Sequence, residues 1–73
     1  MTHTEKNHLV DAYMAAWLAV NDEHCVVNID PNGWFSVKFE RTPHIYRRRA
    51  VDLLRGLAGL TAQLAEKAQK GEQ

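Results

Sequence analysis

The feature that most constrains this fold is a turn, Asp30-Pro31-Asn32-Gly33, between two short stretches of alternating apolar and polar residues. Asp at the first position, Pro at the second and Gly at the fourth are typical of a type I turn, after which Gly33 can take a positive φ as a bulge. The stretches on either side, 24–30 and 34–40, have the period of two that is typical of half-buried strands. The sequence therefore predicts a β-hairpin.

The same turn predicts the register of the hairpin. If Asp30 lies opposite Trp34, one face holds only apolar pairs and the other holds only mixed or polar pairs. The apolar pairs are Ile29 with Phe35, Val27 with Val37, and Cys25 with Phe39, and the others are Asn28 with Ser36, Val26 with Lys38, and His24 with Glu40. A slip by one residue would spoil both faces, so the turn and the alternation agree on one register.

A first helix is expected before the hairpin, from about Thr4 to Val20. Its apolar residues recur at steps of three and four: Leu9, Val10, Tyr13, Met14, Trp17, Leu18 and Val20. Thr2 and Glu5 fit a capping box at its start, and Thr4 is a competing cap. Asn21-Asp22 supplies its end.

A second, longer helix is expected after the hairpin. Thr42 is a plausible cap and Pro43 a natural first residue. Alternatively, residues 44–47 stay extended and the helix begins near Arg48. Gly56 and Gly59 lie inside this helix, where each costs about 1 kcal/mol against Ala. We expect them to allow the close approach of another backbone or of a ring such as that of Trp17, or to permit a bend.

These elements predict one small α+β domain, helix – β-hairpin – long helix, that spans residues 1–73 and has both helices packed on one face of the hairpin. We expect flexible termini at about 1–4 and 69–73. The expected core has these members: Tyr13, Trp17, Val27, Phe35, Val37, Phe39, Leu53, Leu57 and Leu60. Cys25 points into this core, where a thiol acts as a small hydrophobe.

Composition argues against several functions. The formal net charge is zero, whereas a general nucleic-acid binder needs a basic excess. A lone cysteine forms no internal disulfide and suits the cytoplasm.

The four histidines lack the paired spacing of a zinc site, and the acidic residues are scattered rather than converging on a pocket. No segment reaches the ~20 apolar residues of a membrane span. We therefore expect no enzyme activity, no metal or cofactor, no small-molecule substrate and no membrane partner.

A basic cluster is the strongest functional signal in this neutral chain. Arg41, Arg47, Arg48 and Arg49 fall within nine positions, with Lys38, His44 and Arg55 nearby and Tyr46 interleaved. Such a run contacts phosphates or an acidic protein surface, or else forms a solvated helix face with pairs such as Arg48 to Asp52. Trp34 falls on the hairpin face opposite the core and is either an interface anchor or covered by a helix.

The expected partner-binding residues combine this cluster with the aromatic residues beside it. They are Trp34, Lys38, Arg41, His44, Tyr46, Arg47 and Arg48, with His3 and His8 at the polar N-terminus as further candidates. We expect Trp34 with the stretch 41–49 to make the principal contact. The open edges of a two-stranded hairpin would also admit a partner strand.

The chain's length, its helix–hairpin–helix order and its central run from Asp30 through Phe39 to Arg49 resemble the small phage-encoded regulators of host RNA polymerase known from lytic Xanthomonas phages. The resemblance implies binding to the polymerase β and β′ subunits near the flap and the RNA exit channel, in the cytoplasm of the bacterial host. It also implies displacement of the primary sigma factor, inhibition of initiation and antitermination during elongation. A basic cluster near the exit channel could in addition meet nascent RNA. The resemblance assigns no residue roles.

Two other functions fit the same residues. One is a small DNA- or RNA-binding domain that uses the arginine cluster, which would show steep salt dependence. The other is a structural or antitoxin-like module that dimerises through its long helix, which would show a dimer in gel filtration.

Overall fold

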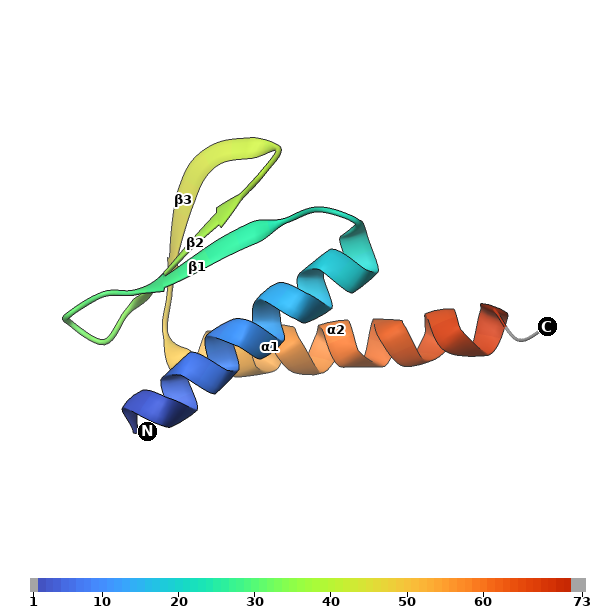
Figure 1. Cartoon of the computed structure of the whole chain (residues 1–73), viewed down its shortest axis with the longest axis horizontal. Helices are drawn as coiled ribbons and strands as arrows, with labels where there is room; N and C mark the ends of the chain where they lie inside the picture. The colour runs from blue at the N-terminus through green and yellow to red at the C-terminus, as the bar shows by residue number, and fades with distance from the viewer. Residues whose placement is uncertain (1, 72–73) are drawn as a thin grey trace.

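The computed structural model describes residues 2–71, in the order α1, β1, β2, β3 and α2 (Figure 1). Helix α1 spans His3–Asn21. The Thr2 hydroxyl accepts a hydrogen bond from the backbone N–H of Glu5 at 3.1 Å, which confirms Thr2 as the N-cap. The Glu5 carboxylate accepts from the Thr2 hydroxyl, also at 3.1 Å, and not from the Thr2 backbone N–H as in a full capping box. The helix ends where Asp22 takes a left-handed conformation with φ 52° and its N–H donates to the Leu18 carbonyl.

The sheet has three antiparallel strands: β1 (Cys25–Ile29), β2 (Phe35–Phe39) and β3 (Thr42–Arg48), with β2 in the centre. The predicted hairpin register between β1 and β2 is confirmed, with Val27 opposite Val37 and Ile29 opposite Phe35. Gly33 has φ 86°, as the turn required, and its N–H donates to the Asp30 carbonyl at 2.9 Å.

Strand β3 corrects the prediction of a two-stranded hairpin followed directly by a helix. Thr42 and Pro43 do not start a helix, because residues 42–48 pair with β2 instead. Thr42, Ile45 and Tyr46 favour strands, and proline is tolerated because β3 is an edge strand. The alternative, in which residues 44–47 stay extended, is the correct one.

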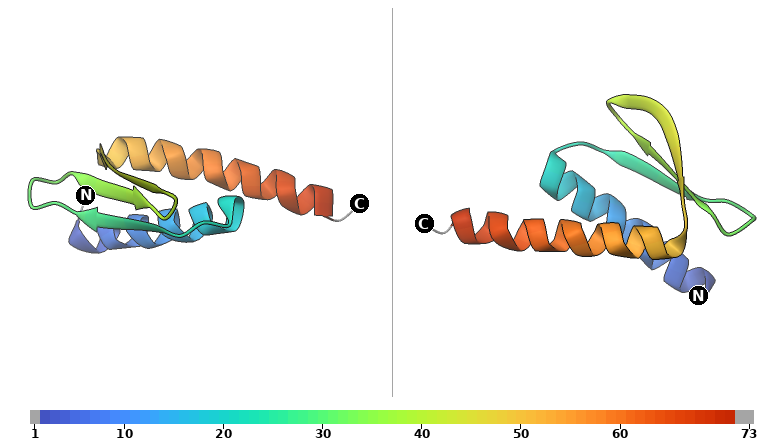
Figure 2. Two further views of the ribbon diagram at one scale, coloured as in Figure 1. Left: turned by 90° about the horizontal axis from the view of Figure 1, so that it is seen from above. Right: turned by 180° about the vertical axis from the view of Figure 1, so that it is seen from behind.

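Helix α2 spans Ala50–Gly71. It runs beside α1 as one layer under the sheet, and its C-terminal half extends past the sheet (Figures 1 and 2). A Cβ at Gly56 would lie 3.2 Å from the Tyr13 ring, so the expected close approach is confirmed there, although the ring is not that of Trp17. At Gly59 the expectation is wrong, because no atom lies within 4 Å of such a Cβ.

The core lies between the helices and the inner face of the sheet. Its buried members are Leu9, Val10, Cys25, Val27, Phe35, Val37 and Leu53. Of the predicted core residues, Tyr13, Trp17, Phe39 and Leu57 are only half-buried and pack around this cluster. Phe35 is completely buried and lies at the centre of the core.

Candidate interaction surfaces

The outer face of the sheet, which points away from both helices, carries an exposed apolar row. The register places Lys38 between Val26 of β1 and Ile45 of β3. Val26 is 54% exposed and Ile45 is 55% exposed. We call Val26, Lys38 and Ile45 the sheet-face row. Because every second residue of a strand points to the same side, Ser36 and Arg47 form the neighbouring row on this face.

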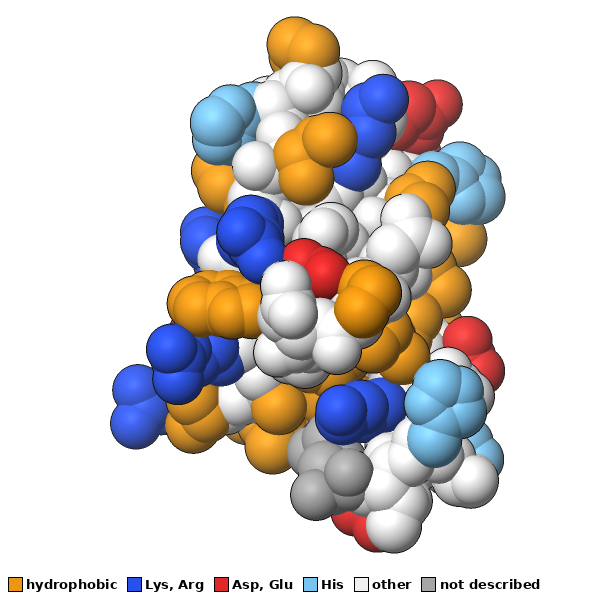
Figure 3. Space-filling model, turned by 90° about the vertical axis from the view of Figure 1, so that its left-hand side faces the viewer, with side chains coloured by type: hydrophobic (Ala, Val, Ile, Leu, Met, Phe, Trp, Pro, Cys, Tyr) orange, Lys and Arg blue, Asp and Glu red, His pale blue; other side chains and the backbone are white. Residues whose placement is uncertain are grey.

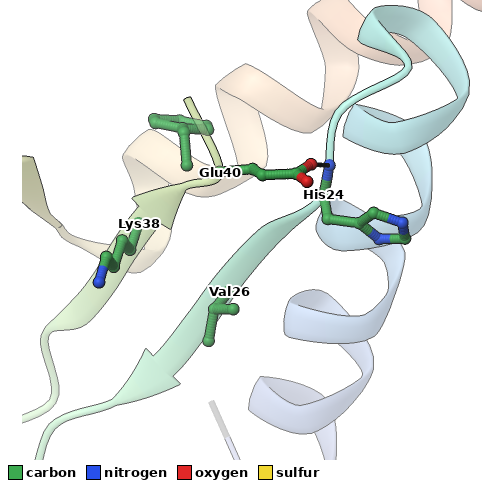
Figure 4. Close-up of a pocket in the computed structure, with 5 residues that line it drawn as sticks. His24, Val26, Lys38 and Glu40 are labelled. Carbon is green, nitrogen blue, oxygen red and sulfur yellow. Dashed lines mark hydrogen bonds between the residues drawn. The ribbon is translucent and has the colours of Figure 1, made fainter. Parts of the chain in front are cut away.

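A shallow hollow of about 400 Å³ borders the sheet-face row. It is lined by His24, Val26, Lys38, Phe39 and Glu40. Figure 4 shows Val26 and Lys38 on neighbouring strands, and the Glu40 carboxylate reaching the backbone of His24. The His24 N–H donates to Glu40 Oε2 at 3.2 Å. The hollow therefore offers an apolar floor with one cation and one anion at its edge.

Two arginines lie over the ring of Trp34. The guanidinium carbon of Arg49 lies 4.5 Å from the centre of the Trp34 ring, and that of Arg47 lies 5.3 Å from it. Arg47 also forms an ion pair with Asp30, with 2.8 Å between Nη2 and Oδ2. We call Trp34, Arg47 and Arg49 the Trp34 cluster. Figure 3, which looks at this end of the molecule, shows basic side chains along one side, next to hydrophobic ones.

Tyr46, Arg48 and His44 project from β3 on the opposite side, toward the helices. The Arg48 guanidinium lies 5.2 Å from the Tyr46 ring centre, and His44 packs edge-on against the same ring at 4.7 Å. A second hollow, of about 140 Å³, lies there between Tyr13, Val37, Phe39, Tyr46 and Arg48. Tyr46 is half-buried against the core, so it also has a structural role.

Arg41 is held by the fold. Its backbone N–H donates to Glu23 Oε2 at 3.0 Å, and its Nε lies 3.9 Å from the same oxygen. Glu23 is buried and also accepts a hydrogen bond from the Trp17 indole N–H at 3.0 Å. Sequence analysis missed Glu23, because its position just after the first helix gives no sign that the chain returns to it 18 residues later.

Apart from Arg41, which lies in the turn between β2 and β3, the structure divides the expected partner-binding residues among three places. Trp34, Lys38 and Arg47 share the outer face of the sheet, whereas His44, Tyr46 and Arg48 lie on the inner side of β3. His3 and His8 are exposed on α1, a separate element. Five positions on a helix put these two histidines about 140° apart around its axis. The pair of Arg48 with Asp52, which the alternative of a solvated helix face suggested, does not form, because Arg48 belongs to β3 and not to the helix. The Asp52 carboxylate accepts the backbone N–H of Arg49 instead.

Two titratable side chains inside the fold have raised pKa values. Cys25 is buried, and burial, with a smaller effect of the Glu23 charge, raises the pKa of its thiol. Burial also raises the pKa of Tyr13, helped by Cys25 and partly offset by Arg48. Within the part of the chain that the structure describes, no group of three or more His, Cys, Asp or Glu residues is placed to hold a metal ion.

Neither helix, over its described residues, is both long and apolar enough to cross a membrane. Comparison with known protein families, curated proteins and solved structures finds no match to this chain.

Proposed function

We propose that this protein is a transcription regulator that binds bacterial RNA polymerase through the outer face of its sheet. It attaches to the β and β′ subunits, excludes the sigma factor, inhibits host initiation and acts as an antiterminator. The sequence resemblance to phage regulators of host polymerase supports the identity of the partner. The proposal needs an exposed surface with apolar anchors, because a stoichiometric regulator works by occupying a site and not by catalysis.

The observation that carries this proposal is the sheet-face row. Helices cover only one face of the sheet, and two β-branched side chains, Val26 and Ile45, stand more than half exposed on the other. Exposed apolar groups rimmed by polar residues mark interaction sites, and anchors near the centre of an interface contribute most of the binding energy. Lys38 between them adds a charge that can orient an acidic partner surface.

We place the centre of the contact at the sheet-face row because two of the arginines already have carboxylate partners. Among the described side chains, ion pairs join Arg41 to Glu23 and Arg47 to Asp30. Their charges are partly neutralised within the chain, so they attract a partner less than their number suggests. Arg48 and Lys38 are free of such pairs among residues 2–69, and they are the cations that we expect to speed association.

A matched pair of substitutions tests the proposal. Val26→Glu places a charge in the sheet-face row, and Val51→Glu makes the same change at a side chain that is 49% exposed on α2. Both variants are first checked for folding by circular dichroism and then compared in an initiation assay with purified polymerase and sigma factor. We expect Val26→Glu to need at least tenfold more protein for the same inhibition, because losing a central anchor costs about 1.4 kcal/mol or more of binding free energy. Val51→Glu should inhibit like the parent.

If folded Val26→Glu inhibits as strongly as the parent, the outer face of the sheet is not the docking surface. If the parent itself neither inhibits initiation nor binds the polymerase, the proposed function is wrong.

A further inference from the structure

We infer that the Trp34 cluster is a binding site for single-stranded nucleic acid, in which a base stacks on Trp34 and arginines hold the flanking phosphates. This inference goes beyond the proposed function, because it concerns a ligand other than polymerase and a different end of the sheet. It can be tested on the isolated chain.

The first support is the way in which Trp34 is covered. Side chains of the fold leave it only half-buried, and two guanidinium groups lie within 5.3 Å of its ring centre. Indole and guanidinium planes are the two kinds of surface on which proteins stack unpaired bases. The cluster therefore presents both kinds of stacking surface at one site.

The second support is the difference between the two arginines. Arg47 is fixed by its 2.8 Å ion pair with Asp30. Arg49 has no carboxylate within 4.0 Å of its guanidinium among the described side chains, and its cation–π contact is worth only about 0.5–1 kcal/mol at an exposed site. Arg49 can therefore move from the ring to a phosphate and leave the ring face to a base, while Arg47 keeps the indole in place.

The third support is the local excess of positive charge. Arg48 follows Arg47 directly, and its guanidinium donates to the Arg47 carbonyl at 3.0 Å instead of pairing with an acid. Asp30 neutralises Arg47, whereas Arg49, beside Trp34, and Arg48, on the inner side of β3, have no carboxylate partner among the described side chains. Arg49 is therefore the cation that remains available for a phosphate next to the indole. This patch gives a neutral chain the local basic surface that phosphate binding requires.

The geometry favours an unpaired strand over a duplex or an acidic protein. Bases in a duplex keep their faces stacked inside the helix and cannot reach an indole ring. An acidic peptide would satisfy the arginines but would have no flat π-surface for Trp34. A single strand offers a phosphate and a free base face in each nucleotide, which matches the pairing of charge and ring in the cluster.

The test measures the fluorescence anisotropy of a labelled ten-nucleotide oligouridylate titrated with the intact chain at several salt concentrations. Trp34→Leu removes the stacking surface, and Arg49→Gln removes the mobile cation. Lys67→Gln makes the same charge change on α2 beyond the sheet, where Lys67 donates to the Ala19 carbonyl, and serves as the control. Circular dichroism checks the fold of each variant.

We expect Trp34→Leu to weaken binding about tenfold or more, within the range for losing one base–aromatic stack. Arg49→Gln should weaken the salt dependence of binding. The slope of log K against log salt concentration should become less negative by about 0.7, the value for one phosphate on a single strand. Lys67→Gln should bind like the parent. The oligonucleotide should quench tryptophan emission in the parent but not in Trp34→Leu, although Trp17 remains in both.

Titrations with other ligands identify the class of ligand that the site prefers. Comparable binding of oligodeoxythymidylate indicates a site for single strands of either kind, and preference for oligouridylate indicates RNA; both support the site. Stronger binding of a duplex, or equal binding of a polyglutamate peptide, would overturn it. The same holds if Trp34→Leu binds the single strand as tightly as the parent, or if the parent shows no salt-dependent binding.

Discussion

At the scale of single residues, Glu23 joins the end of α1 to the turn between β2 and β3. One carboxylate oxygen accepts the Trp17 indole N–H and the other accepts the Arg41 backbone N–H, both at 3.0 Å. A buried carboxylate in a neutral chain is costly unless its oxygens are hydrogen-bonded, and here both are. The residue therefore stabilises the fold and leaves Arg41 less available to a partner.

Glu23→Ala should lower the free energy of unfolding by about 2–4 kcal/mol, because it leaves two part-buried donors without their charged acceptor. Glu40→Ala is the control, since Glu40 is exposed and accepts one hydrogen bond, from His24 N–H, and should cost about 1 kcal/mol or less. Urea unfolding measures both. Equal losses in the two variants would show that the Glu23 network adds no more stability than the single exposed hydrogen bond of Glu40.

Cys25 makes the free energy of unfolding depend on pH in the alkaline range. Because its folded-state pKa is raised, the folded chain holds more protons than the unfolded chain once the pH exceeds the thiol's unfolded pKa of about 8.5. The contribution is fully present below that value and is lost as the pH rises through the folded-state pKa. Cys25→Ala should be less stable at pH 7 but should show a shallower decline in unfolding free energy between pH 8 and 10. Tyr13, whose ordinary pKa is higher, adds a similar decline in both proteins, so identical slopes would contradict the role of Cys25.

At the scale of elements, the β1–β2 hairpin could be predicted fully and strand β3 could not. The turn at Asp30–Gly33 and two short alternations are local signals, and each gave the same register. Strand β3 has mixed signals, because Thr42-Pro43 is also a common helix start and three arginines follow one another at its end. What decides its conformation is pairing with β2, which is a tertiary interaction that a local pattern does not contain.

The two glycines of α2 offer a matched test of its packing. Gly59→Ala adds a methyl group in open space, so it should stabilise the protein by about 1 kcal/mol through helix propensity. Gly56→Ala gains the same propensity, but its methyl group would lie 3.2 Å from the Tyr13 ring, so it should gain less or destabilise. Thermal unfolding measures both variants. A gain at position 56 equal to that at position 59 would mean that Tyr13 does not pack tightly against α2.

At the scale of the whole molecule, the fold class, the helix order and the inner face of the sheet follow from the sequence. The candidate site follows only in part. Trp34, Lys38 and Arg47 were expected to be partner-binding, and they share the outer face. The apolar part of that face was missed, because Ile45 belongs to the unpredicted strand and Val26 alternates with core residues as any exposed strand position does. The contact of the Arg49 guanidinium with the Trp34 ring was also missed, because it depends on where the unpredicted strand β3 ends.

The layered arrangement gives the molecule two separate surfaces on one side. The sheet-face row is apolar and is proposed to dock on protein, whereas the Trp34 cluster is basic and aromatic and is proposed to hold a single strand. A two-stranded hairpin would have provided neither, because Ile45, Arg47 and Arg49 take their positions from β3. The third strand is therefore the element on which both proposals depend.

The most direct test of the central claim is a calorimetric titration of the intact chain into purified core RNA polymerase, with and without saturating sigma factor. The account predicts saturable binding to the core enzyme at a stoichiometry of one, strongly weakened when sigma is bound. It also predicts at least tenfold weaker binding of Val26→Glu and unchanged binding of Val51→Glu. Absence of binding to the core enzyme, or equal binding in the presence of sigma, would contradict it.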